Sequence, residues 1–276
     1  MRGKSQFSTV LDHAVLIAGT VIMCGPLLAI AITTTHGPEV LARDGLTLIP
    51  GGDAWANYSW FMSTPLGQDP DVTVIRLMWN SFALGAGFAG LKVGLSLLAA
   101  YALVYFRIRF ATPVFWLLLL SLMLPLESRF LPTYDVVAGL GLTNTQAGLI
   151  LPLAASGIGT FFFRQFLQTI PDTLLEAARL DGAGPIRFLV DILFPMSLPL
   201  MGALFIVTFV NGWNQYLWPV LITSEEASYT LVRGLQYFGQ SSLSGLMLAC
   251  LSVLPPALLV LLFQRQVVKG LFEGNH

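Results

Sequence analysis

The chain has 276 residues, of which 55% are hydrophobic and only 11% are charged, and its mean hydropathy is +0.74. A soluble globular chain carries about 25% charged residues, so this composition excludes an ordinary water-soluble domain and indicates lipid as the main solvent. The formal net charge of −1 says nothing by itself about binding partners. Nothing alternates with the period of two that a membrane β-barrel needs, so we predict an all-α membrane protein.

The first apolar run, residues 14–32, follows Arg2 and Lys4. Such a start fits either a cleaved signal peptide or an uncut first membrane helix. The run approaches the roughly 20 residues that cross a bilayer core of about 30 Å. Because more apolar runs follow, we favour the uncut helix and predict six transmembrane helices. Their predicted ranges are 12–34, 79–105, 113–131, 146–168, 196–222 and 243–264.

The distribution of Lys and Arg predicts the orientation of these helices. With a cytoplasmic N-terminus, the inside segments carry Arg2, Lys4, Arg107, Arg109, Arg164, Arg179, Arg187, Arg265 and Lys269, and the outside segments carry only Arg43, Arg76, Arg129 and Arg233. That asymmetry favours both termini in the cytoplasm. We divide the chain into a first helix with an outer loop (1–71), a permease-like core (72–265) with a charged cytoplasmic loop at 169–195, and a cytoplasmic tail (266–276).

The loop at 169–195 has clear helix punctuation. Thr173 and Glu176 have the spacing of a capping box, and Gly182 suits a left-handed helix stop. Gly184-Pro185 then begins a second short helix, with Pro185 at its first position, and this helix ends where the fifth span begins at Pro195. The sequence therefore predicts two short helices that meet at a glycine corner, where small residues let another protein approach closely.

This segment resembles the EAA loop of bacterial ABC importer permeases, which are inner-membrane proteins. Their pattern of Glu-Ala-Ala, three residues, Gly, nine residues and Ile-x-Leu-Pro is matched by Glu176-Ala177-Ala178, Gly182, Ile192 and Pro195, with Phe194 in place of Leu. The stretch Asn211-Gly212-Trp213-Asn214-Gln215-Tyr216-Leu217-Trp218-Pro219 is similar to the span-five signature of the carbohydrate-type (MalG-like) permeases. The stretches 124–129, 132–133, 147–149 and 163–166 look closest to members that import sn-glycerol-3-phosphate.

The resemblance implies the type I ABC importer permease fold and a subunit that moves its substrate by alternating access. Its partners would be a sister permease, two ATPase subunits, a periplasmic substrate-binding protein and membrane lipid, with no nucleic acid. The substrate would be sn-glycerol-3-phosphate or glycerophosphodiesters, with a sugar or polyol as the alternative. The residues implied to dock on and couple to the ATPase are Glu176, Ala177, Ala178, Arg179, Asp181 and Gly182; for Glu176 simple helix capping is the alternative. ATP and Mg would be bound by the ATPase, and this chain would bind no cofactor.

Several polar residues lie inside the predicted spans. Lys92 is central in the second span, where a Lys costs about 2.5–3.5 kcal/mol. It either meets an anionic substrate, packs against a sister helix with backbone carbonyls as partners, or snorkels. The tentative pathway residues of the fifth span are Asn211, Trp213, Asn214, Gln215, Tyr216 and Trp218; interhelical hydrogen bonding and an aromatic belt are the alternative. Arg129 is expected to pair with Glu127 or to touch the binding protein. Gly85, Gly87, Gly90 and Gly94 are expected to allow close helix packing.

Other function classes find little support. Gly3-Lys4-Ser5 matches only the tail of a nucleotide-binding loop, His13, His36 and His276 are too scattered for a metal site, and no nucleophile elbow occurs. We therefore expect no catalytic residue and no metal ligand. A secondary transporter driven by an ion gradient is the stronger rival, but such folds often show internal repeats and paired intramembrane acids, which this sequence lacks.

Overall fold

The computed structural model describes residues 6–67, 69–239 and 242–272, and its side-chain detail excludes 6–9, 126–127 and 266–272. Over these ranges the chain forms helices and loops without any strand, which confirms the predicted all-α class. The chain divides into two compact units. One comprises residues up to 76 together with 234–254, and the other comprises 77–233 together with the residues from 255 onwards.

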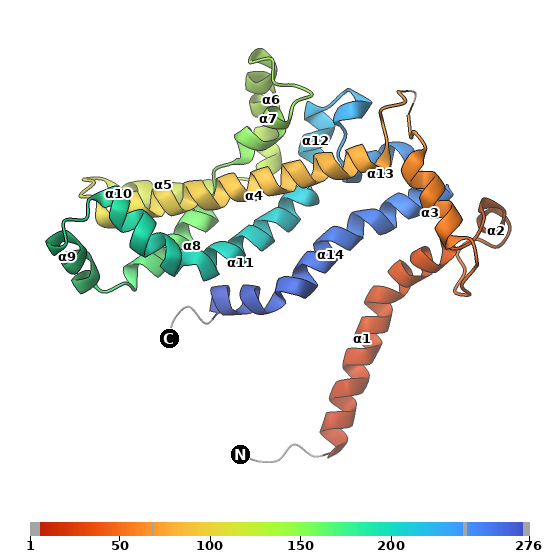
Figure 1. The fold of residues 1–276 in the computed structure, drawn as a ribbon, viewed down its shortest axis with the longest axis horizontal. Coiled ribbons are helices and arrows are strands. Elements are labelled where there is room, and N and C mark those ends of the chain that lie inside the picture. The colour runs from red at the N-terminus through yellow and green to blue at the C-terminus, as the bar shows by residue number, and fades with distance from the viewer. Residues whose placement is uncertain (1–5, 68, 240–241, 273–276) are drawn as a thin grey trace. The chain divides into compact units, whose positions relative to one another are not determined.

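The first unit is built around the N-terminal helix. It contains α1 (Gln6–Thr33), α2 (Pro38–Asp44), α3 (Ala54–Ser63) and the first part of α14 (Leu243–Phe272) (Figure 1). The span within α1 has a mean hydropathy of 2.5, and most of its apolar side chains, among them Leu16, Ile22 and Met23, are exposed. Such a surface is unfavourable in water and suits a lipid environment.

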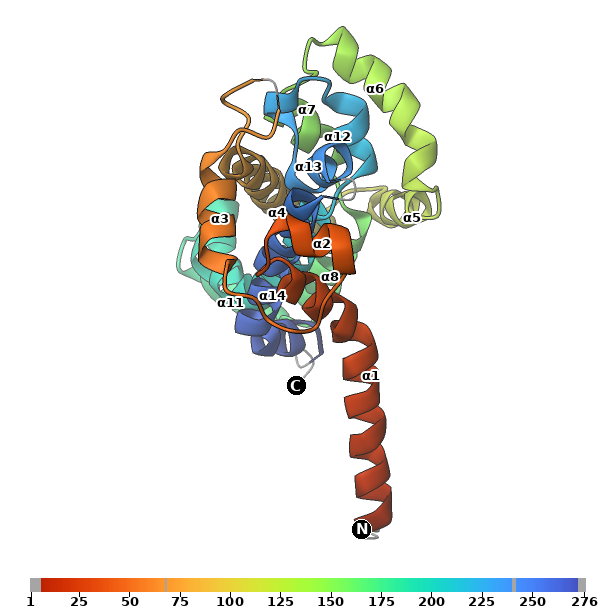
Figure 2. The ribbon, with the colours of Figure 1, turned by 90° about the vertical axis from the view of Figure 1, so that its right-hand side faces the viewer.

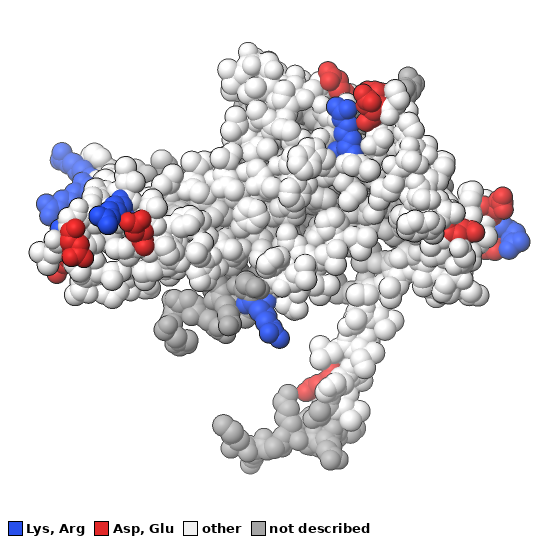
Figure 3. Space-filling model, in the orientation of Figure 1, with Lys and Arg blue, Asp and Glu red and all other residues white. Residues whose placement is uncertain are grey.

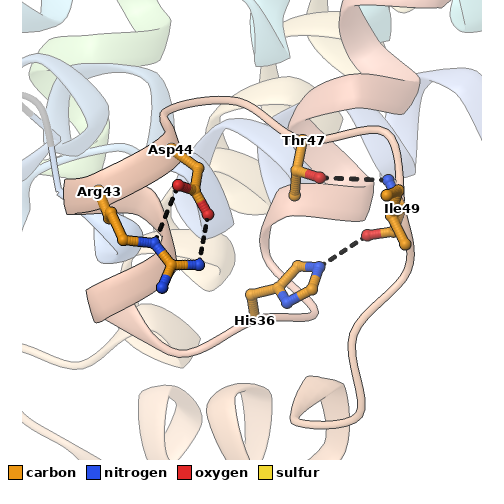
Figure 4. A network of polar contacts seen from close by, with 5 residues as sticks. All are labelled: His36, Arg43, Asp44, Thr47 and Ile49. Carbon is orange, nitrogen blue, oxygen red and sulfur yellow. Dashed lines mark hydrogen bonds and ion pairs between the residues drawn. The ribbon is translucent and has the colours of Figure 1, made fainter.

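Short polar contacts hold the loop between α1 and α3 (Figure 4). The Nε2 atom of His36 lies 2.7 Å from the carbonyl oxygen of Ile49, whose N–H donates to the Thr47 hydroxyl over 3.2 Å. Arg43 donates to both carboxylate oxygens of Asp44 over 2.9 and 2.8 Å. Because this ion pair is solvent-exposed, it contributes little to stability, and the backbone contacts matter more for the shape of the loop.

The second unit holds most of the helices. They are α4 (Val74–Tyr105), which starts in the first unit, α5 (Ala111–Ser121), α6 (Phe130–Gly139), α7 (Gln146–Ile150), α8 (Gly157–Gln168), α9 (Asp172–Leu180), α10 (Pro185–Arg187), α11 (Phe194–Trp213), α12 (Leu217–Ile222) and α13 (Leu231–Phe238), which continues into the first unit. Shorter 3₁₀ segments are η1 (Leu126–Arg129), η2 (Leu151–Leu153) and η4 (Glu226–Ser228), and η3 (Phe188–Leu193) is a π-helix.

Two apolar cores lie along α4 in this unit. The first core joins α4 to α8, α9 and α11, with Leu97, Phe163 and Leu193 almost fully buried. The second core joins α4 to α6, α7 and α12, three helices that gather together in Figure 2, and it buries Leu84 and Trp218. The unit is therefore organised by one long helix that contributes to both cores.

The predicted spans are confirmed only in part. Four described helices are long and apolar enough to cross a membrane: Val10–Thr33, Val74–Tyr105, Pro185–Trp213 and Leu243–Arg265. Residues 146–168 form a pair of helices bent by 53°, which gives five spans if the pair is counted as one. The described ranges thus contain fewer than the six single transmembrane helices that we predicted.

The third predicted span, 113–131, is wrong as a single helix. Its helix α5 has 11 residues, which is about 16 Å at 1.5 Å per residue and too short for a core of about 30 Å. The chain then turns through 122–125 into η1 and α6. Hydropathy stays high through residues 122–126, so composition does not mark where the helix breaks, and Pro125 is the local signal within that stretch.

The predicted fourth and fifth spans are also interrupted. In the fourth, the Ser156 hydroxyl accepts a hydrogen bond from the Gly159 N–H over 3.1 Å and starts a new helix, α8. In the fifth, α11 ends at Trp213, and α12 begins only at Leu217. Both interruptions fall at polar residues, Ser156 in the fourth span and Asn214 in the fifth.

Glycines allow α4 and α11 to approach closely, and the two helices run alongside one another in Figure 1. A Cβ atom on Gly85 would lie 3.1 Å from the Phe209 ring, and one on Gly212 would lie 3.0 Å from the Gly85 Cα. A Cβ on Gly87 would lie 2.6 Å from Ile150, whereas Gly90 and Gly94 have nothing within 4 Å. The packing prediction is therefore confirmed for Gly85 and Gly87, and it stays a prediction for Gly90 and Gly94, which approach no described residue of this chain.

Gly85→Val is expected to destabilise the second unit, because the added methyl groups overpack the contact with Phe209. Overpacking of this kind costs about 1–3 kcal/mol, which thermal unfolding of the detergent-purified protein would measure as a lower Tm. Gly90→Val on the same helix is the matched control and should leave Tm unchanged. Equal Tm values for the two variants would mean that the close approach of α4 and α11 is not a determinant of stability.

Candidate functional site

In the view of Figure 3, one gathering of charged side chains in the second unit lies over α9 and α10 and another lies near α12, whereas the surface along α4 between them is largely uncharged. Helix α9 begins at Asp172, after Pro171 in an extended conformation, and its first turn closes through a hydrogen bond from Leu174 N–H to the Pro171 carbonyl over 3.1 Å. No side chain caps this end. The predicted capping box is therefore wrong, because Thr173 already lies inside the first turn of the helix. Asp172 precedes it in that turn, where a negative charge interacts favourably with the helix dipole.

The predicted glycine stop is confirmed. Gly182 has a φ of +75°, the left-handed conformation that glycine adopts without steric cost. The Ala183 N–H donates to the Ala178 carbonyl over 2.8 Å, and the Gly182 N–H donates to the Arg179 carbonyl over 3.1 Å. These two bonds form a Schellman motif, which ends α9 and turns the chain sharply.

The second short helix predicted after this corner is not separate. Pro185 stands at its first position, as predicted, but α10 runs through the π-helix η3 into α11 as one helix, Pro185–Trp213, of 29 residues. The π-helical turns directly precede Pro195. Because proline lacks the N–H of a regular turn, a locally widened helix lets the chain pass this residue without stopping.

The inner face of the corner packs on the rest of the unit. Ala178 is 5% exposed and belongs to the same core as Phe188. The Tyr101 hydroxyl, on α4, donates to the Pro185 carbonyl over 2.8 Å. Arg179 lines a cavity of about 330 Å³ that also touches Arg107 and Pro185. The corner is thus held against both α4 and α11.

The outer face of the corner is exposed and partly apolar. Of the predicted coupling residues, Glu176, Ala177, Arg179, Asp181 and Gly182 are exposed, and only Ala178 is buried. Leu180 is 89% exposed and Ile186 is 78% exposed, beside Gly182. The sequence analysis missed these two residues. Spacing offered a signal for Leu180, which follows Ala177 by three and Glu176 by four residues and so shares their face.

Lys92 lines two neighbouring cavities in the second unit. One has a volume of about 200 Å³ and is also lined by Ser96, Ser156 and Asn211. The other has a volume of about 450 Å³ and is also lined by Ser156 and Arg129. Lys92 and Asn211, both predicted pathway residues, are therefore brought together by α4 and α11. Arg129 joins them, whereas the Glu127 side chain lies outside the described residues.

The two tryptophans predicted for the pathway are buried instead. Trp213 is 2% exposed and stacks on Phe209 with ring centroids 6.0 Å apart. Trp218 is 0% exposed, and its Nε1–H donates to the carbonyls of Gly148 and Leu149 over 3.3 and 3.2 Å. Neither lines the cavities beside Lys92, so the structure gives a pathway role for these rings no support and favours packing.

The remaining fifth-span residues lie at the break between α11 and α12. Asn214 follows the last residue of α11 and is exposed, Gln215 donates its N–H to the Gly212 carbonyl over 3.2 Å, and Tyr216 directly precedes α12. They do not line the cavities beside Lys92. Among the described residues, no three His, Cys, Asp or Glu side chains are placed to hold a metal ion.

Comparison with known proteins gives one family and several relatives. Residues 81–272 match the family described as binding-protein-dependent transport system inner membrane component. The chain is 42% identical over 270 residues to the sn-glycerol-3-phosphate transport system permease protein UgpE of Agrobacterium fabrum, with 96% of each chain covered. It is 40% identical over 276 residues to the protein of that name from Rhizobium meliloti, with 98% of each covered.

A solved structure supports the fold. The chain superposes with a TM-score of 0.72 and 18% identity on a chain from the crystal structure of a bacterial ABC transporter involved in the import of the acidic polysaccharide alginate, and 99% of each chain is covered. At this identity the likeness concerns the fold alone.

Proposed function

Because the chain belongs to the family of inner membrane components of binding-protein-dependent transport systems, we propose that it is a permease subunit of an ATP-driven importer of sn-glycerol-3-phosphate. The substrate is inferred from one observation. The chain is about 40% identical, over nearly its full length, to permeases named for that substrate. Glycerophosphodiesters would follow the same route. The protein is a multi-pass component of the bacterial inner membrane.

The coupling step takes place at the α9 corner. An ATPase subunit docks on the exposed face of α9, where Glu176, Ala177 and Leu180 lie together. Leu180 and Ile186 add exposed apolar side chains to this charged corner, and a docked protein would cover them. Glu176 does not cap its helix through its side chain, which supports docking over the simple capping role.

Motion at the corner reaches the cavity through one continuous helix. From Pro185 to Asn211 the chain is helical without a break, a length of about 40 Å at 1.5 Å per residue. The hydrogen bond from Tyr101 to Pro185 also ties the corner to α4, which carries Lys92. When the ATPases close, α9 moves, and α11 and α4 transmit the displacement to the cavity walls. Alternating access follows, since the cavity opens first to one side of the membrane and then to the other.

The other components lie in separate chains. The assembly comprises this subunit, a sister permease, two ATPase subunits that bind ATP and Mg, and a periplasmic binding protein that delivers substrate. This chain itself is non-catalytic and binds no cofactor. Both of its termini are cytoplasmic, by the excess of Lys and Arg on that side, and residues 72–265 form the permease core.

Copurification with the neighbouring permease and ATPase tests this function. ATP hydrolysis in lipid, with the loaded binding protein added, should rise with sn-glycerol-3-phosphate and not with maltose-like sugars. Stimulation by a sugar or polyol instead would keep the importer class and refute the substrate. Failure of any ATPase subunit to copurify would refute the importer class itself.

A further inference from the structure

Two cationic side chains from distant parts of the chain line one cavity. Lys92 comes from α4, and Arg129 ends η1, yet both border the cavity of about 450 Å³. This volume falls in the range of about 300–1,000 Å³ that small-molecule sites occupy. No Asp or Glu is among the described side chains that line it. Among the described side chains, the lining of this cavity therefore presents two positive charges and no carboxylate.

Neither Lys92 nor Arg129 forms a hydrogen bond or an ion pair within the described part of the chain. Lys92 contacts the face of the Phe88 ring, with Nζ 4.0 Å from the ring centroid, and forms no hydrogen bond or ion pair with a described residue. The Arg129 side chain likewise forms none. Like charges at one cavity repel each other, so their placement is unfavourable without an anion between them. Ionisable groups at membrane depth are costly and mark substrate or ion pathways.

A third polar side chain borders the adjoining cavity. Asn211 on α11 lines the cavity of about 200 Å³ that shares Lys92 and Ser156 with the larger one. Its amide also lacks a hydrogen bond to any described residue. Because Asn211 is exposed, its amide is accessible to a ligand. A ligand with hydroxyl groups next to its anionic group could satisfy all three side chains at once.

Phosphate monoesters fit this arrangement better than neutral sugars. A phosphate carries close to two negative charges at neutral pH and several strong acceptor oxygens, and Arg and Lys line anion and phosphate pores. Arg offers two parallel donors to phosphate, and Lys offers a compact charge. A neutral sugar would offer neither cation of this cavity a counter-charge, whereas a phosphate would offer one to both.

We propose that Lys92 and Arg129 together hold the phosphate group of the substrate during its passage through the membrane, with Asn211 facing the glycerol hydroxyls. This inference rests on the proposed function and deepens it, because it makes this permease subunit select for anionic cargo independently of the binding protein. An anionic lipid headgroup offers the same phosphate chemistry, and the experiment has to separate the two sources.

The transport arm uses the assembled importer in proteoliposomes. Lys92→Gln and Arg129→Gln should each lower the rate of sn-glycerol-3-phosphate uptake about tenfold or more, the loss expected for one charge-assisted hydrogen bond. Lys92→Arg and Arg129→Lys, which keep the charge, should retain most of the uptake. Arg109→Gln changes an exposed Arg in the loop between α4 and α5 and should have no effect. Unchanged uptake in both neutral variants would overturn the proposal and leave the proposed function standing.

A labelling arm tests the anion site without relying on transport. Thr133 lines the larger cavity, so Thr133→Cys, with Cys24 and Cys250 replaced by alanine, reports on it. An anionic methanethiosulfonate reagent should react faster than its trimethylammonium analogue, and the rate ratio should fall about tenfold when Lys92→Gln and Arg129→Gln are added. An unchanged ratio would overturn the proposal even if a neutral variant failed to assemble for transport.

Protection from labelling identifies the source of the phosphate. In phosphatidylcholine vesicles, sn-glycerol-3-phosphate should slow the anionic reagent, and glycerol should not. If added phosphatidylglycerol protects and sn-glycerol-3-phosphate does not, the cations hold a lipid headgroup and the substrate assignment is refuted. A third outcome separates the site from the proposed function. The unmodified importer could transport no sn-glycerol-3-phosphate, while the anionic reagent still labels Thr133→Cys faster than the cationic one and sn-glycerol-3-phosphate still slows that labelling. The proposed function would then fail, and the phosphate site would stand.

Discussion

Leu180→Asp is expected to abolish retention of the ATPase and, with it, ATP-driven uptake. Leu180 is 89% exposed on the face of α9 that also carries Glu176 and Ala177, so its side chain is available for a partner. Truncating a central apolar anchor costs about 2 kcal/mol or more, and an aspartate there adds the cost of burying a charge. Copurified ATPase should therefore fall at least about thirtyfold, measured by its yield on a tag placed on the permease.

The control for this variant is Leu48→Asp. Leu48 is 70% exposed in the loop after α2. Its variant makes the same change from leucine to aspartate at a surface where we propose no ATPase contact. It should leave copurification unchanged. Because Leu180 contributes little to the core of its own unit, both variants should also fold with the normal Tm. Retention of the ATPase by Leu180→Asp at the normal level would place the docking surface elsewhere.

Gly182→Val is expected to uncouple ATP hydrolysis from the loaded binding protein. Gly182 has a φ of +75°, a conformation that costs an L-residue about 1–2 kcal/mol and a β-branched residue more. The corner should relax to a different φ, which breaks the Schellman bonds of Gly182 and Ala183 and turns α9 away from its docked direction. Stimulated ATP hydrolysis should drop about tenfold or more, as a loss of about 1.4 kcal/mol would produce.

Two variants separate backbone conformation from crowding at this corner. A Cβ at Gly182 would meet nothing within 4 Å, so a clash with neighbouring atoms would not explain a loss of stimulated ATP hydrolysis. Gly184→Ala is the matched control, because Gly184 also has open space and a φ of −74° that alanine adopts freely. Gly182→Asn should give an intermediate loss, since asparagine tolerates the left-handed region. Equal hydrolysis rates in Gly182→Val and Gly184→Ala would refute the conformational argument.

The corner was predictable because its signals are local. Pro171 and Pro185 fix their own φ, and Gly182 permits the left-handed conformation, so sequence alone placed the helix end at Gly182 and the next start at Pro185. What sequence could not show is the continuity from α10 into α11. A proline at 195 reads as a boundary, yet the helix continues past it, with π-helical turns just before it.

The cavity was only half predictable, because its residues meet through tertiary packing. Lys92 stood out as a lone cation in an apolar run, and Asn211 as an amide in another. Arg129, in contrast, seemed to end a span on the outside, since the break of the third span at 122–125 is invisible in hydropathy. The burial of Trp213 and Trp218 also depends on partners far away in sequence, which no local pattern reports.

Uptake by proteoliposomes tests the central claim most directly. The complete importer is reconstituted with ATP enclosed on the side of the ATPases, and radiolabelled sn-glycerol-3-phosphate and loaded binding protein are supplied on the other side. We predict uptake that requires ATP and is lost when a non-hydrolysable analogue replaces it, with or without a proton or sodium gradient. Uptake that continues without ATP while an ion gradient is present would contradict the account and identify a secondary transporter.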